Sequence, residues 1–158
     1  MADSDKAGND VDGERLVAHA PDAVIFADRD GVIRTWNAAA HRIFGHAPED
    51  AIGRSLDMII PEQFREAHWT GFDRALTDGK TKYVGQSLAT KSVDANGETI
   101  YVELSFAIVP GDDGSAAGAL AHARDITDRF QQEREQRKKL AALENELAEL
   151  RGDRPARG

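Results

Sequence analysis

The sequence predicts an α+β fold: a five-stranded antiparallel sheet with helices packed on one face, followed by a C-terminal coiled-coil helix. Two turns, Asp30-Gly31 and Asn96-Gly97, each separate β-rich segments and are typical of hairpins. Residues 98–109 alternate between apolar and polar side chains, as a half-buried antiparallel strand does. Residues 128–151 contain leucines at alternating spacings of three and four, which indicates an amphipathic helix that pairs with another helix.

Composition and charge limit the classes of protein to which the chain can belong. Its 158 residues suffice for one domain with a hydrophobic core and a helical extension. The formal net charge of −8 argues against nucleic acid or an anionic membrane as the main partner. No apolar segment is long enough to span a membrane and no signal-peptide pattern is present, so we expect a cytoplasmic protein. The absence of cysteine excludes disulfides, thiolate metal ligands and flavin–cysteine adducts.

The first third of the chain is expected to contain a disordered tail, one hairpin and several short helices. Residues 1–12 are rich in Asp, Gly, Ser and Ala, and we expect them to be disordered, as we do residues 152–158. A short helix over 13–19 precedes the strands 23–27 and 32–36 of the first hairpin. The helices that follow are expected over 38–44, capped by Asn37 and ended by Gly45, over 48–52, and over 56–60, capped by Ser55.

The helix expected between Pro61 and Gly79 is the element around which the candidate site is organised. Proline suits a first helical turn, and glycine is a common end signal. One histidine, His68, lies in the middle of an apolar stripe made by Phe64, Phe72, Ala75 and Leu76. A lone histidine on an apolar face is more often a satisfied core residue than a ligand. The residues alone therefore leave both roles open.

Three hairpin-linked strands, expected over 81–93, 98–109 and about 116–124, complete the sheet. The apolar face of the middle strand is expected to meet the stripe that contains His68. Its residues are Ile100, Val102, Leu104, Phe106 and Ile108. In the first strand, alternation with Val84 and Leu88 predicts that Gln86 points inward, where its amide needs a partner. The candidates for that partner are a bound gas, the edge of a flavin ring and the backbone.

The C-terminal segment 127–151 is expected to form a helix that dimerises and transmits a signal. Its seam would consist of Leu140 and Leu147 at a positions and Leu143 and Leu150 at d positions. In a parallel pair, Lys139 meets Glu144 of the second helix and Glu146 meets Arg151, and each contact adds about 0.2–1 kcal/mol. The alternative is a single solvated amphipathic helix.

The order of these elements resembles that of a PAS domain. The resemblance is carried by Asn37, which opens the first long helix, by Ile43-Phe44-Gly45, which closes it, and by Arg124-Asp125-Ile126-Thr127, which leads from the last strand into the exit helix. It covers about residues 15–130 and implies a PAS sensor domain over 13–126, followed by the coiled-coil helix.

Part of the chain further resembles the haem-binding PAS domain of FixL-type oxygen sensors, through Pro61-Glu62, Arg65, His68 and Arg74. The resemblance implies that His68 is the axial iron ligand of haem b and that Arg74 contacts a propionate. Lys82 falls where the family has a histidine near a propionate. The position of the family's distal arginine is Leu88 in this sequence, and the position of the distal methionine ligand of related sensors is Gln86, so this chain retains neither distal group. The hydroxyl of Tyr83 is an alternative distal group. The expected cofactor-binding residues are therefore His68, Arg74, Lys82, Tyr83, Val84, Gln86, Leu88, Leu104 and Phe106.

The resemblance implies a haem-binding sensory domain that detects a diatomic gas (O2, CO or NO) or a redox state. The signal would pass through the dimeric C-terminal helix to a downstream signalling protein or an output domain. Two alternatives are a ligand-free PAS interaction and dimerisation module, with His68 inert, and a cysteine-independent FAD-binding sensor that uses Gln86. The sequence contains no phosphate-binding glycine loop and no nucleophile with a plausible base, so we expect no enzymatic activity.

Overall fold

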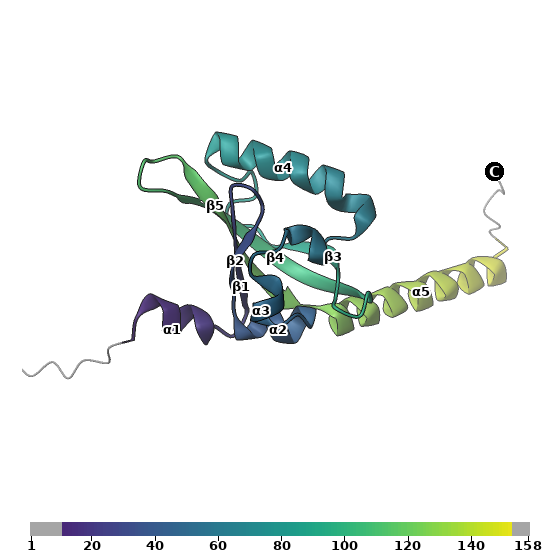
Figure 1. Cartoon of the computed structure of the whole chain (residues 1–158). Helices are drawn as coiled ribbons and strands as arrows, with labels where there is room; N and C mark the ends of the chain where they lie inside the picture. The colour runs from purple at the N-terminus through teal and green to yellow at the C-terminus, as the bar shows by residue number, and fades with distance from the viewer. Residues whose placement is uncertain (1–10, 153–158) are drawn as a thin grey trace, which may run out of the picture. The chain divides into compact units, whose positions relative to one another are not determined.

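The computed structural model of the protein describes residues 11–152 (Figure 1). By their internal contacts these residues divide into two compact units, one ending at Asp125 and the other beginning at Ile126. The first unit contains α1 (Gly13–Ala18), β1 (Ala23–Asp28), β2 (Ile33–Trp36), α2 (Ala38–Phe44), α3 (Pro48–Ala51), the 3-10 helices η1 (Leu56–Ile59) and η2 (Glu62–Phe64), α4 (Arg65–Asp78), β3 (Leu88–Val93), β4 (Thr99–Pro110) and β5 (Ala116–Asp125). The second contains α5 (Thr127–Leu150).

The predicted five-stranded antiparallel sheet is confirmed, and its strand order is β2-β1-β5-β4-β3. Three of the neighbouring pairs are hairpins between consecutive strands. The fourth pair joins β1 to β5, which lie far apart in the sequence, with Ala23 opposite Ala123. An ion pair strengthens this junction, because Arg124 donates to both carboxylate oxygens of Asp22, at 3.1 and 2.9 Å. These hydrogen bonds lower the pKa of the Asp22 carboxyl.

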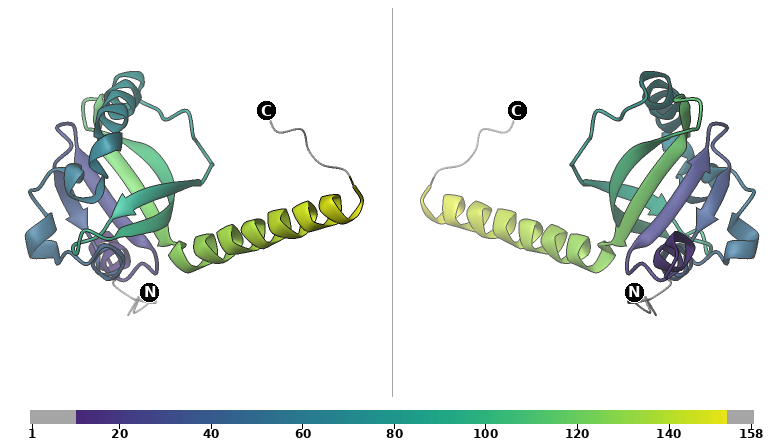
Figure 2. Two further views of the ribbon diagram at one scale, coloured as in Figure 1. Left: turned by 90° about the vertical axis from the view of Figure 1, so that its right-hand side faces the viewer. Right: turned by 90° about the vertical axis from the view of Figure 1, so that its left-hand side faces the viewer.

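The hydrophobic core lies between the sheet and the short helices. Residues directly opposite one another on neighbouring strands share a face, and the apolar face includes Ile25, Trp36, Val102 and Ala123. Ala39, Ala40 and Phe44 of α2 and Ala51 of α3 pack with this face. Figure 2 shows the strands as one curved sheet, with α4 at one end and α2 and α3 toward the other.

The predicted Asn37 cap is confirmed, and its side chain does more than cap a helix. Its Oδ1 accepts hydrogen bonds from the backbone N–H groups of Ala40 and Val24, both at 3.0 Å. Its Nδ2 donates to the carbonyl oxygens of Val17 at 2.9 Å and Asp22 at 3.1 Å. Only 5% of Asn37 is exposed. One buried amide therefore joins α1, the start of β1 and the start of α2.

The predicted strand 81–93 is wrong in its first half, since β3 begins at Leu88. The Gln86 N–H donates to the Tyr83 carbonyl oxygen at 3.0 Å, and Gly85 has a φ of 72°, in the left-handed region. This turn interrupts the extended backbone, so side chains do not alternate between two faces here. The prediction that Gln86 points inward depended on that alternation and is therefore wrong. Both Val84 and Gln86 are exposed.

The predicted central helix begins later than expected. Pro61 is followed by η2, and the α-helix starts at Arg65. A 3-10 segment has 3.0 residues per turn instead of 3.6, so Phe64 does not continue the stripe of α4. It is 44% exposed. Helix α4 packs mainly on β5, whereas the sequence predicted that its stripe would meet the apolar face of β4.

The second unit consists of one long helix, α5. In α5 the side chains of Leu140, Leu143 and Leu147 are 51–57% exposed and Leu150 is 85% exposed. Among residues 11–152, no helix has the length and apolarity needed to cross a membrane. The expected disorder of residues 1–10 and 153–158 lies outside the described residues. Asp12 is not disordered, because it caps α1 by accepting from the Arg15 N–H at 2.8 Å.

Candidate functional site

The candidate site is centred on the imidazole of His68 in α4. The side chain is half-buried, and its Nδ1 atom is buried without a hydrogen-bond partner among the described residues. Burial lowers the pKa of this imidazole, and the carboxylate of Asp57 opposes the effect. The ring is therefore neutral at neutral pH and keeps a lone pair that can bind a metal.

Two aromatic side chains of the same helix surround this imidazole. The His68 and Trp69 ring centroids are 4.8 Å apart at an interplanar angle of 80°, an edge-to-face arrangement. Phe72 lies 5.9 Å from His68 and 5.3 Å from Trp69. Phe72 is the buried residue of α4, so the cluster of His68, Trp69 and Phe72 lies on the side of the helix that faces the protein interior.

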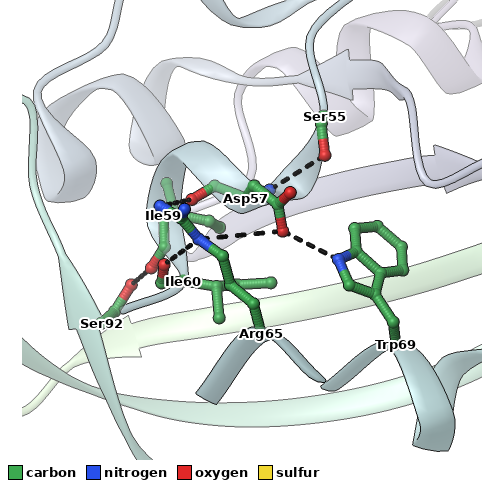
Figure 3. Close-up of polar contacts among 7 residues, drawn as sticks. All are labelled: Ser55, Asp57, Ile59, Ile60, Arg65, Trp69 and Ser92. Carbon is green, nitrogen blue, oxygen red and sulfur yellow. Dashed lines mark hydrogen bonds and ion pairs between the residues drawn. The ribbon is translucent and has the colours of Figure 1, made fainter. Parts of the chain in front are cut away.

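A hydrogen-bonded network holds Trp69 and the start of α4 (Figure 3). The Trp69 indole Nε1–H donates to Asp57 Oδ1 at 2.8 Å. The Nε of Arg65 lies 3.9 Å from the same oxygen. Asp57 itself sits in η1, where its backbone N–H donates to Ser55 Oγ at 3.2 Å. Asp57 was not predicted as a site residue, because the contact spans 12 positions and has no local sequence signal.

Arg65 also fixes η1 to the beginning of α4. Its Nε donates to the carbonyl oxygen of Ile60 at 3.1 Å, and its Nη2 donates to that of Asp57 at 3.2 Å. On the other side of η1, the buried Ser92 hydroxyl of β3 donates to the Ile59 carbonyl oxygen. The 3-10 segment is therefore bonded both to the helix that carries His68 and to the edge strand of the sheet (Figure 3).

The sheet face toward α4 is apolar and lined by small side chains at its centre. Ala119 and Ala121 of β5 lie on this face, since Ala121 is opposite the buried Ile25. Both alanines are only half-buried, although β5 is the central strand. Leu104 and Phe106 on the neighbouring strand β4 are half-buried too. The central strand thus presents small, partly exposed apolar side chains on the face toward α4, which the sequence did not indicate.

The structure brings only some of the predicted site residues to this face. Leu88 lies opposite Leu104 on the sheet and is half-buried. The turn over residues 81–87 carries four of the others: Lys82, Tyr83, Val84 and Gln86. Of these only Tyr83 is half-buried, and the Lys82 ammonium lies 4.9 Å from the centre of its ring. Arg74 is exposed on α4.

A family model described as the PAS fold matches residues 17–131 of the chain. The chain belongs to the PAS family. It is 27% identical over 137 residues to the sensor protein FixL of Bradyrhizobium diazoefficiens, which confirms the predicted resemblance. It is 26% identical over 148 residues to the oxygen sensor protein DosP of Escherichia coli.

These matches cover most of this PAS chain but a small part of the relatives. They span 86% of the chain and 26% of FixL, and 92% of the chain and 18% of DosP. Among solved structures, the PAS domain of a Colwellia psychrerythraea protein has a TM-score of 0.63 at 23% identity, covering 73% of this chain and 94% of that one. The chain is thus a PAS sensory domain of the kind found in sensor proteins.

Proposed function

We propose that this PAS domain binds haem b through His68 and senses a diatomic gas or a redox state. The observation that carries the proposal is the His68 imidazole, which lies half-buried beside the rings of Trp69 and Phe72 and which burial keeps neutral by lowering its pKa. A neutral imidazole is the usual proximal ligand of haem iron.

The residues around His68 fit a flat apolar group. When bound, haem supplies an iron atom that coordinates diatomic gases and changes oxidation state. Ala119 and Ala121 are small, half-buried side chains on the central strand, and Leu104 and Phe106 offer half-buried apolar surface beside them. The exposed cations Arg74 and Lys82 would hold the propionates at the water-exposed edge.

The relatives FixL and DosP support the proposal, because one is a sensor protein and the other an oxygen sensor by name. The gas would be O2, CO or NO. By the resemblance, Leu88 and Gln86 fall where the family has its distal groups. Gln86 is exposed on its turn. We propose no enzymatic activity for this chain.

Titration of the haem-free protein with hemin tests the proposal. We expect a Soret band in the wild type, and at least about 100-fold weaker binding with an altered spectrum in His68→Ala, because the iron loses its axial ligand. His41→Ala, which removes an exposed histidine from α2, should bind hemin as the wild type does.

An unchanged Soret band in His68→Ala would rule out His68 as the ligand. Purified protein that is yellow and rejects hemin would favour the FAD-binding alternative. Colourless protein that binds neither group would favour a ligand-free interaction module.

We further propose that α5 forms a parallel homodimeric coiled coil and passes the signal to a downstream protein or output domain. The four leucines at 140, 143, 147 and 150 form a stripe that the described part of the chain leaves more than half exposed. Helices bury such a stripe by pairing. The chain spans about a quarter or less of FixL and DosP, which agrees with an output element elsewhere in those relatives.

Charge in the leucine seam tests the dimer. Leu143→Asp with Leu147→Asp should convert a dimer of twice 17.2 kDa into a monomer by light scattering, because two buried charges per helix lack partners. Ala142→Asp with Asn145→Asp introduces charge outside the seam and should leave the dimer intact. A mass that is the same for both double variants would reject the proposed pairing.

A further inference from the structure

We propose that Asp57 and Trp69 are positioning residues that orient the imidazole of His68. The Asp57 carboxylate accepts a hydrogen bond from the Trp69 indole, and the indole in turn packs against the imidazole. This inference rests on the proposed role of His68 as the iron ligand.

A histidine that binds a metal is usually oriented by a hydrogen bond from its second ring nitrogen to a carboxylate, carbonyl or water. In the described part of the chain, Nδ1 of His68 is buried and has no such partner. The direction of the imidazole must therefore come from the side chains packed against it.

Trp69 is the closer of the two rings and meets the imidazole nearly at a right angle, at 4.8 Å and 80°. An edge-to-face contact constrains the tilt of a ring because the positive edge of one faces the negative face of the other. The ring of Phe72 also packs against the imidazole, with 5.9 Å between the two ring centroids. If Trp69 is fixed, the direction of the His68 ring is fixed with it.

Trp69 is held at both ends. At one end, its Nε1–H donates to Asp57 Oδ1 at 2.8 Å. At the other, the six-membered ring lies directly over Gly31, where an added Cβ would be only 2.1 Å from Trp69 Cη2. The indole therefore cannot swing toward Gly31, and rotation the other way would break its hydrogen bond.

Asp57 is itself fixed, so it can hold the indole. The Ser55 hydroxyl caps its backbone N–H, and Arg65 binds its carbonyl oxygen at 3.2 Å while lying 3.9 Å from its carboxylate. Figure 3 shows Arg65 and Trp69 reaching the same carboxylate of η1 from α4. The position of η1 thus determines that of the Asp57 carboxylate, which holds the Trp69 indole, which in turn orients the His68 imidazole.

The test uses four variants. Trp69→Phe keeps an aromatic ring but loses the N–H, Asp57→Ala loses the acceptor, and Asp57→Asn keeps an acceptor oxygen. Asp73→Ala removes an exposed carboxylate from the same helix and serves as the control. Backbone amide spectra of β5 show whether each variant keeps the fold.

The first readout is NMR of the haem-free protein, with the His68 ring protons assigned from the His68→Ala spectrum. Trp69 shifts these protons by its ring current, so we expect them to move toward values of a free histidine in Asp57→Ala and Trp69→Phe. They should stay near the wild-type values in Asp57→Asn and Asp73→Ala. A purely structural role of Asp57 would not be rescued by asparagine in this way.

The second readout is hemin affinity. Loss of the groups that orient a metal ligand typically weakens binding 10–100-fold, and we expect about 10-fold in Asp57→Ala and in Trp69→Phe. The double variant should bind no more weakly than either single variant, because both act through one hydrogen bond.

Unchanged His68 ring shifts in Asp57→Ala would overturn the inference, even if the wild type binds hemin. Failure of the wild type to bind hemin would instead overturn the proposed function. In that case the ring shifts alone would decide whether Asp57 and Trp69 orient the imidazole.

Discussion

Replacement of Asn37 by alanine is expected to lower the free energy of unfolding by about 3–5 kcal/mol, measured by urea denaturation. The substitution removes four hydrogen bonds, and it leaves the N–H groups of Val24 and Ala40 without their acceptor in the interior. Each buried group that loses its partner costs about 1–3 kcal/mol. The carbonyl groups of Val17 and Asp22 lie nearer the surface and can turn to water.

Asp12→Ala is the matched control, because Asp12 also caps a helix but makes a single, exposed hydrogen bond to the Arg15 N–H. Its loss should cost about 1 kcal/mol or less. If the two variants were equally stable, Asn37 would be an ordinary cap, and the junction of α1, β1 and α2 would not depend on it.

Replacement of Gly31 by alanine is expected to lower the free energy of unfolding by about 3–5 kcal/mol and to displace Trp69. Gly31 has a φ of 75°, which costs a residue with a Cβ about 1–2 kcal/mol. The new methyl group would also lie 2.1 Å from Trp69 Cη2, and overpacking of this kind costs a further 1–3 kcal/mol or so.

Gly97→Ala separates these two effects. Gly97 has a φ of 76°, and a Cβ there would meet nothing within 4 Å. It should therefore show the backbone cost of about 1–2 kcal/mol and no change in the environment of Trp69. Equal stabilities of the two variants, or an unchanged Trp69 indole N–H resonance in Gly31→Ala, would contradict the packing of Trp69 on Gly31.

Elements with strong local signals were predicted within one or two residues of their observed bounds. Helix α2 begins after the Asn37 cap and ends at Gly45, whose φ of 79° suits glycine alone. Strand β4 follows the Asn96-Gly97 turn and runs over Thr99–Pro110, close to the predicted 98–109. In each case the residues that specify the element lie inside it or next to it, so a single sequence contains the information.

The errors occurred where that local information competed with other interactions. Residues 81–87 resemble a strand by composition, but the turn at Gly85 directs Val84 and Gln86 to solvent. Phe64 has helical spacing to His68, but the 3-10 geometry of η2 rotates it out of the stripe. Neither outcome follows from periodicity, because both depend on how the ends of α4 are held.

The sequence by itself determined the antiparallel hairpins, the helix caps and the presence of one histidine on an apolar helix face, because these depend on residues close together in the chain. Only the tertiary structure decided that β1 pairs with β5, that Asp57 reaches Trp69, and that Nδ1 of His68 has no partner in the described residues. These are contacts between distant segments. They form only when the whole sheet and its helices have packed, and no short pattern in the chain encodes them.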